Sequence, residues 1–273
     1  MKRGLFFAAI LFVMQACFSP ALYAQRSAHT GVAAWSFRLF PLEVALLKAD
    51  STGVKYIEAF GGQLLEKGGS TFSPAMPDDS IQWLKNQLLQ RKLQMRSAYL
   101  PAPTTKEAWE QAFRFAHALG LSYITTEPQP EHFDLLNKLG TQYQIKIALH
   151  NHPRGSSRFW HPDSVLAALK GRPQLGVCAD VGHWARSGIN IVTALRQLKG
   201  HIIALHIKDI DTFDKTDAAD VPLGTGVIDF RAICHEMKQQ QFSGYYIIER
   251  EGNWHNNVPE IKAAVKLFND ISR

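Results

Sequence analysis

Two histidines close an apolar run in the stretch ALHNHP, where His150 and His152 stand two positions apart. Side chains at positions i and i+2 of a strand project to the same face, so the two imidazoles are expected to lie together. Residues that bind protons or metals end other apolar runs as well: Glu58, Glu127, Asp180, His206, Lys208, Glu249 and Glu251. A single charged residue at a strand end is ordinarily only a solvated terminus. Several of them crowded together would repel one another unless a divalent cation neutralised them, so the pattern predicts a metal site.

Eight apolar runs of strand type carry these residues, at positions 31–37, 54–60, 93–100, 122–128, 145–152, 175–180, 202–209 and 245–251. Near-continuous apolar strands are typical of a parallel sheet that is covered by helices. Amphipathic helical patterns alternate with them, at 41–53, 79–92, 104–120, 130–143, 161–171, 190–200, 229–241 and 258–272. We expect Asp79 or Ser80 to cap the second helix and a threonine, Thr104 or Thr105, to cap the third, which Gly120 ends. Eight strand–helix units predict an α/β fold of the TIM-barrel type, (β/α)8, rather than an open sheet.

The long connections follow strands rather than precede them. They cover residues 61–77, 151–160 and 210–226, whereas the links from a helix to the next strand are short. In barrels of this kind, enzymes build their sites from the loops at the carboxyl ends of the strands. The histidines and carboxylates are therefore expected at one functional face.

The amino terminus has the features of a secretory signal. A basic start at Lys2 and Arg3 precedes a short apolar run, and Ala24 stands before Gln25. This predicts a signal peptide over residues 1–24, export to the periplasm, and a single barrel domain over residues 25–273. Anchoring through a lipid on Cys17 is the weaker alternative, because MQAC is a poor lipobox. The apolar run is too short for a permanent membrane span.

The net charge bears on whether nucleic acid is a partner, and the positions of the cysteines bear on whether they form a disulfide. Removal of Lys2 and Arg3 lowers the formal net charge from +6 to +4. With no block of Lys or Arg, nucleic acid is not indicated as a partner. Cys178 follows an apolar strand and Cys234 lies in a helical pattern, so both are expected to be buried free thiols.

The segments ALHNHP, GVCADVGHWARSG, ALHIKD, VPLGTGVIDF and YYIIERE, in this order, resemble the sugar phosphate isomerase/epimerase family, the xylose isomerase-like TIM barrels. In that family one divalent metal is held by a Glu, an Asp, a His and a Glu at the ends of strands five to eight. The resemblance implies His150, Asp180, His206 and Glu249 as ligands here, with a histidine in place of the first glutamate. An imidazole favours Mn, Fe, Co or Zn over Mg. The family's epimerases use two glutamates to move a proton, and Glu127 is the alternative source of the missing carboxylate.

Other polar and aromatic residues near the strand ends are candidates for catalysis or substrate contact. His152 is a candidate general base, or a structural residue. Lys208 is a candidate to neutralise a developing enolate, or a partner of Glu251 in an internal salt bridge. The resemblance implies that His183 contacts substrate or metal. The remaining expected substrate contacts, for which plain packing is the alternative, are Trp35, Glu58, Trp184 and Glu251.

These parts favour proton abstraction next to a carbonyl, through an enediolate. We expect an isomerase or epimerase acting on an unphosphorylated sugar, because the chain is predicted to be exported and lacks a phosphate-binding motif. The alternative is a 3-keto-glycoside lyase or hydratase that acts by β-elimination after a partner oxidoreductase has made the ketone. A second alternative is a sugar-binding barrel without catalysis. A nuclease of the abasic-site type would need a strongly basic groove, which the mild charge does not indicate.

Overall fold

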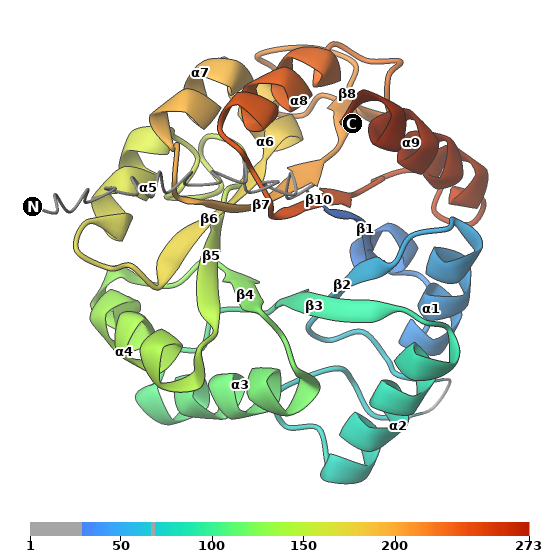
Figure 1. Cartoon of the computed structure of the whole chain (residues 1–273), viewed down its shortest axis with the longest axis vertical. Coiled ribbons are helices and arrows are strands. Elements are labelled where there is room, and N and C mark those ends of the chain that lie inside the picture. The colour runs from blue at the N-terminus through green and yellow to red at the C-terminus, as the bar shows by residue number, and fades with distance from the viewer. Residues whose placement is uncertain (1–28, 67–68, 273) are drawn as a thin grey trace, which may run out of the picture.

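The computed structural model describes residues 29–66 and 69–272, so the predicted signal peptide and Cys17 lie outside the described residues. Eight parallel strands close into a barrel in the order β1-β10-β7-β6-β5-β4-β3-β2, with a helical ring around them (Figure 1). Their bounds are β1 His29–Ala33, β2 Tyr56–Phe60, β3 Gln94–Tyr99, β4 Tyr123–Thr126, β5 Lys146–His150, β6 Leu175–Asp180, β7 Ile202–Ile207 and β10 Tyr245–Ile248. The prediction of a (β/α)8 TIM barrel is confirmed.

A helix follows each barrel strand, as the alternating pattern predicts. The bounds are α1 Leu42–Ser51, α2 Asp78–Gln90, α3 Lys106–Leu119, α4 Phe133–Tyr143, α5 Pro162–Leu169, α7 Ile191–Gln197, α8 Phe230–Gln239 and α9 Val258–Ile271. Thr105 caps α3 by accepting a hydrogen bond from the Ala108 amide at 3.2 Å, and Gly120 ends it in the left-handed conformation. The expected cap of α2 is wrong by two or three residues, because Pro77 occupies the N-cap position and the helix begins at Asp78.

Four local features differ from the sequence prediction. Residues Ala34–Phe37, expected to continue the first strand, form the 3-10 helix η1, and a second short 3-10 helix, η2 Pro130–His132, precedes α4. A short helix α6, Val181–Arg186, follows β6 because the Asp180 side chain accepts a hydrogen bond from the His183 amide and caps it. The long loop after β7 contains an antiparallel pair, β8 Asp209–Ile210 with β9 Asp220–Val221.

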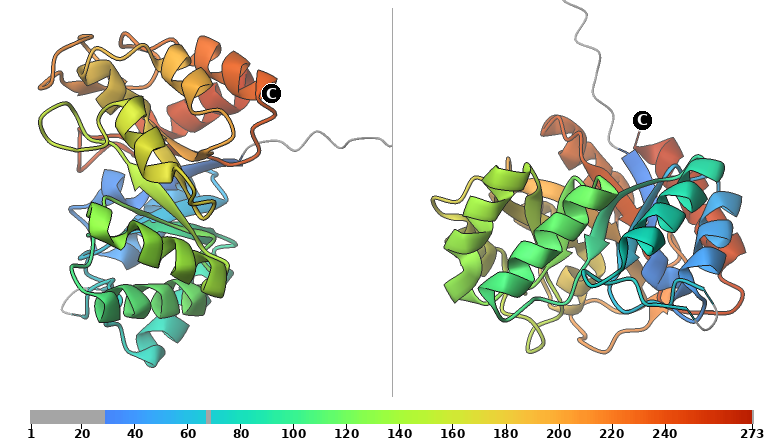
Figure 2. Two further views of the ribbon diagram at one scale, coloured as in Figure 1. Left: turned by 90° about the vertical axis from the view of Figure 1, so that its left-hand side faces the viewer. Right: turned by 90° about the horizontal axis from the view of Figure 1, so that it is seen from below.

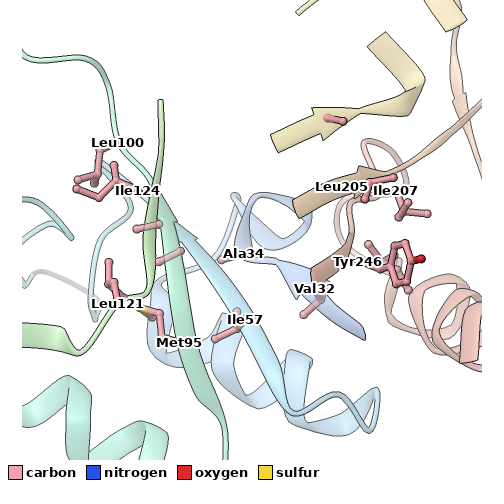
Figure 3. Close-up of a cluster of buried hydrophobic side chains, with 14 of the residues drawn as sticks. Val32, Ala34, Ile57, Met95, Leu100, Leu121, Ile124, Leu205, Ile207 and Tyr246 are labelled. Carbon is pink, nitrogen blue, oxygen red and sulfur yellow. The ribbon is translucent and has the colours of Figure 1, made fainter. Parts of the chain in front are cut away.

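The outward faces of the strands form the main hydrophobic core beneath the helices. Val32, Ile57, Met95 and Leu205 belong to this buried cluster (Figure 3). Inside the barrel, a second buried cluster consists of Tyr123, Ala148, Cys178 and Ala204. Because side chains alternate along each strand, the residues two and four positions further on also point inward, toward the carboxyl-terminal rim.

The strand register brings these polar inward positions to one level of the barrel. Asp180 pairs with His206 across β6 and β7, and Ala33 pairs with Glu58 across β1 and β2. The loops after β5 and β7 extend from the side of the barrel opposite the carboxyl terminus (Figure 2). The parallel strands therefore place the predicted histidines, carboxylates and Lys208 at the same rim of the barrel.

Two further expectations concern single features of the chain. Cys178 and Cys234 are free and buried, as predicted. Within residues 29–66 and 69–272, no helix combines the length and the apolar character needed to cross a bilayer.

Candidate active site

Four buried donor atoms from four neighbouring strands converge at the rim. The Nδ1 of His206 lies 3.2 Å from Nε2 of His150, 3.1 Å from Oε2 of Glu249 and 3.9 Å from Oδ2 of Asp180. The Nε2 of His150 lies 3.7 Å from the same Asp180 oxygen. Donors bound about 2.1 Å from one tetrahedral ion would stand about 3.4 Å apart. The ligand atoms of His150, Asp180 and His206 all lie within 4.8 Å of one another and suit a single cation, and Glu249 joins them through its contact with His206. We call these four residues the donor cluster.

The contacts of the two carboxylates in the donor cluster also bear on whether the cluster can bind a cation. Oδ2 of Asp180 and Oε2 of Glu249 are buried, and the Lys208 ammonium faces both of them at 3.1 Å and 3.0 Å. Buried oxygens of this kind are costly unless a cation compensates them. Two imidazoles and two carboxylates form a donor set suited to Zn, Mn, Fe or Co. The residues present therefore fit one divalent cation.

Glu58 orients His206 from inside the barrel. Its Oε1 lies 2.6 Å from Nε2 of His206, and its Oε2 accepts a hydrogen bond from Thr125 Oγ1 at 2.8 Å. Burial alone would raise the pKa of Glu58, but His206, Ser97 and Thr125 lower it, so the carboxylate is ionised. A carboxylate on the far nitrogen is the usual support of a metal-binding histidine, because it aims the other nitrogen at the ion.

His206 is held as a cation between two carboxylates in the structure described. Burial alone would lower its pKa, but Cys178, Glu58 and Glu249 raise it well above 6.5. Burial raises the pKa of the Cys178 thiol to about 11, so the thiol is neutral at pH 7. The two carboxylates are therefore the effective cause, and a metal ion at Nδ1 would have to displace a proton.

Asn151 fixes the backbone of Asp180 across two strands. Its Nδ2 donates to the Asp180 carbonyl at 3.0 Å, and its Oδ1 accepts from the Asp180 amide at 2.8 Å. Oδ1 of Asp180 accepts from the His183 amide at 2.8 Å as the cap of α6. One Asp180 oxygen is thus used by the helix, and the other is left for the donor cluster.

Glu127 binds His152 and also lies beside the donor cluster, with Oε1 3.7 Å from Nδ1 of His150. Glu127, His150 and His152 therefore form a second group of ligand-type atoms that could hold a metal ion. The Nδ1 of His152 forms a short hydrogen bond with Oε1 of Glu127, whose other oxygen accepts from Ser157 Oγ at 2.6 Å. The Tyr99 hydroxyl donates to Oε1 of the same carboxylate at 3.4 Å. Burial alone would raise the pKa of Glu127, but hydrogen bonds from His150, His152 and Ser157 lower it. When Nδ1–H is donated to this carboxylate, the neutral tautomer of His152 carries its lone pair on Nε2, the atom from which a general base would accept a proton.

His183 has the opposite tautomer. Two cations face its ring nitrogens: Arg186 lies 3.1 Å from Nδ1, and Nζ of Lys208 lies 3.5 Å from Nε2. The Arg186 contact is the shorter, so Nδ1 accepts, and the hydrogen of a neutral ring lies on Nε2, 3.6 Å from Oδ2 of Asp180. The ring is neutral because burial lowers its pKa well below 6.5, and the nearby charge of Lys208 lowers it further, against the opposing effect of Asp180. The rings of His183 and His152 lie 4.9 Å apart. A hydrogen-bond donor and a proton acceptor therefore stand side by side.

Most of these groups open into one cavity of about 210 Å³, but Asp180 and Glu127 lie behind its lining residues. Of the predicted residues, Trp35, Glu58, His150, His152, His183, His206, Lys208, Glu249 and Glu251 line it. Trp35 also stacks on Arg38, whose guanidinium carbon lies 4.7 Å from that ring and 4.1 Å from the ring of Trp254. Trp184 is a correction to the sequence prediction: its side chain is fully buried in the core under α6, away from the cavity.

Several residues of the site were missed by the sequence analysis. Phe60 and Tyr99 line the cavity at the ends of β2 and β3, and the inward alternation of those strands was a signal that could have identified them. Asn151 and Arg186 act through hydrogen bonds that depend on tertiary contacts. Ser157 lies in the loop after β5, and nothing in its sequence context points to Glu127.

The comparisons with known proteins agree with this architecture. The family model described as xylose isomerase-like TIM barrel matches residues 46–271. An uncharacterised protein from Parabacteroides distasonis is 31% identical, with a TM-score of 0.72 over 89% of this chain and 98% of that chain. The IolI protein with a bound zinc atom (18%, TM-score 0.71) and L-ribulose 3-epimerase (17%, TM-score 0.71) are similar in fold; the matches cover 89% and 90% of this chain, and 98% and 94% of theirs. No curated protein matches the chain.

Glu58→Gln is expected to weaken metal binding by about tenfold to a hundredfold, because the amide cannot supply the negative charge that supports His206. Calorimetric titration with Zn²⁺ measures the dissociation constant. The matched control is Glu236→Gln. This variant removes a buried carboxylate on α8, whose Oε2 accepts a hydrogen bond from Nε of Arg196 at 2.7 Å, away from the donor cluster. Equal affinity in Glu58→Gln and the wild type would contradict the role of Glu58.

Metal affinity is expected to rise with pH, because the ion displaces a proton from His206, whose pKa in the folded chain is raised well above 6.5. The same shift stabilises the metal-free fold below the unfolded pKa of histidine, and this contribution is lost as pH rises through the folded pKa. One displaced proton gives about tenfold tighter binding per pH unit. Titrations between about pH 6 and pH 8, in buffers of different ionisation enthalpy, measure both affinity and proton release. Flat affinity without proton release would refute this assignment.

Proposed function

Because the chain belongs to the xylose isomerase-like TIM barrel family, we propose that it is a metal-dependent enzyme of the isomerase or epimerase type. Its substrate is an unphosphorylated sugar, from which it removes a proton next to a carbonyl. The observation that carries the proposal is that three members of the donor cluster, His150, His206 and Glu249, share one cavity with His152. The ring centroid of His152 lies 4.7 Å from that of His150.

Different residues at the site have different proposed roles in proton transfer. When bound by His150, Asp180, His206 and Glu249, a divalent cation supplies Lewis-acid polarisation of a substrate carbonyl. His152 accepts the proton at Nε2, and Glu127 stabilises the imidazolium that forms. The Nε2–H of His183 donates a hydrogen bond to a substrate oxygen.

The cations around the cavity support an unphosphorylated substrate. Lys208 is the permanent cation among the described lining residues, and three carboxylates already surround it within 3.1 Å. A phosphate dianion is normally bound by cations or amides that are free to pair with it. The export predicted from residues 1–24 agrees with a free sugar, because sugar phosphates are scarce outside the cytoplasm. Trp35 offers an aromatic face for the sugar ring.

β-Elimination from a 3-keto-glycoside is the second candidate, and His150 is the observation that favours it. In the two-glutamate mechanism, the position of His150 holds one of the two groups that exchange protons with opposite faces of the substrate. Elimination requires one base and one donor near the leaving group, as His152 and His183 provide. A separate oxidoreductase would supply the ketone for this reaction.

A panel of sugars and 3-keto-glycosides, incubated with the Mn²⁺- or Zn²⁺-loaded protein in D₂O, tests the proposal by NMR. Deuterium entering at the carbon next to the carbonyl, with formation of an isomer, supports the isomerase or epimerase. Release of the aglycone supports the lyase. A protein that binds metal and sugar but does neither is a binding barrel, and this outcome would overturn the proposal.

His152→Ala is expected to keep the metal and to lower turnover by about 10²- to 10⁴-fold, because it removes only the base. Asp180→Asn and His206→Ala are expected to lose both metal and activity. Metal content by atomic emission, measured beside the deuterium exchange rate, separates the two classes. Full metal content in Asp180→Asn and His206→Ala, or full activity in His152→Ala, would contradict these roles.

A further inference from the structure

The ammonium of Lys208 contacts the same oxygens that the donor cluster turns toward His206. Its Nζ lies 3.1 Å from Oδ2 of Asp180 and 3.0 Å from Oε2 of Glu249. A third carboxylate oxygen, Oε1 of Glu251, lies 3.0 Å away. The lysine side chain is only 1% exposed, so water does not screen its charge from these groups.

Contacts at both ends of its side chain fix the position of Lys208. At Gly182 in α6, an added Cβ would stand 2.2 Å from Cγ and 2.8 Å from Cδ of Lys208, so the aliphatic stem runs directly against the helix backbone. At the other end, Glu251 is itself held by Arg186, whose NH1 lies 3.5 Å from Oε2. Only glycine at position 182 leaves room for the lysine to reach the donor cluster.

We propose that Lys208 is an internal counter-cation that shares Asp180 and Glu249 with the metal. This inference rests on the metal site of the proposed function. Without metal, the ammonium holds the two carboxylates together and offsets their repulsion. With metal, the ammonium and the dication repel each other and compete for charge on the same two oxygens, so Lys208 weakens metal binding.

The sharing also changes which metal the site prefers. Lys208 withdraws charge from the two carboxylates but leaves the two imidazoles of the donor cluster untouched. Ions that prefer oxygen donors, such as Mn²⁺, therefore lose more affinity than Zn²⁺, which binds imidazole well. Lys208 thus favours a nitrogen-preferring ion at this rim.

Lys208→Met tests the proposal, because methionine keeps much of the stem and removes the charge. Calorimetric titration is expected to show about tenfold tighter Zn²⁺ binding than in the wild type, with a larger gain for Mn²⁺. Thermal unfolding is expected to show a lower Tm without metal and a larger rise in Tm on adding metal. Lys170→Met, at the exposed end of α5, is the control and should match the wild type.

Gly182→Ala is the second variant, because its methyl group pushes the stem of Lys208 away while the charge stays in the protein. Gly182→Ala is expected to bind Mn²⁺ more tightly than the wild type, by a smaller factor than Lys208→Met. It keeps the proposal testable if Lys208→Met does not fold. Unchanged or weaker metal binding in the folded variants would overturn the counter-cation role while leaving the metal site intact. A wild-type protein that binds neither ion would instead refute the metal site of the proposed function.

Discussion

Electrostatic repulsion among buried carboxylates is the constraint on which the rim of this barrel depends. Glu58, Asp180 and Glu249 are buried within one end of the barrel, and each would be strongly unfavourable alone. Two cationic groups compensate them: His206 lies between Glu58 and Glu249, and Lys208 lies between Asp180 and Glu249. Every ligand-type side chain at this rim is thus fixed by a partner of opposite charge, and the geometry needed to bind a cation results from that pairing.

The two histidines that end β5 show how neighbours assign different roles to identical side chains. His150 turns Nε2 toward His206 and Asp180, whereas His152 gives Nδ1–H to Glu127. A carboxylate bound to one ring nitrogen leaves the other free as a base, and a nitrogen that faces other metal-binding atoms becomes a ligand. In the proposed function, His150 stands where the resemblance places a family glutamate, and the proposed base is His152, which Glu127 holds through a hydrogen bond.

Much of this arrangement could be predicted from the sequence, because it depends on local periodicity. The period of two places His206 and Lys208 on the inward face of one strand, and the eightfold alternation of strands and helices is enough to predict closure. The family resemblance, rather than the periodicity, implied His150, Asp180, His206 and Glu249 as ligands, and the structure brings these four side chains to one rim. Trp35 lines the cavity, and its contact with substrate stays a prediction. The prediction of a substrate contact was wrong for Trp184, because a tryptophan in the turn after a strand can face either the cavity or the helical core, and only the path of α6 places it in the core.

The sequence by itself determined the barrel, its functional rim and the kinds of side chain that meet there, since these follow from spacing along single strands. Only the tertiary structure decided which atoms meet. The pairing of Glu127 with His152, the support of His206 by Glu58 and the contact of Lys208 with Asp180 and Glu249 join residues on different strands. The physical reason is that partner choice depends on register, rotamer and burial across the barrel, and these arise when the strands close around a common interior.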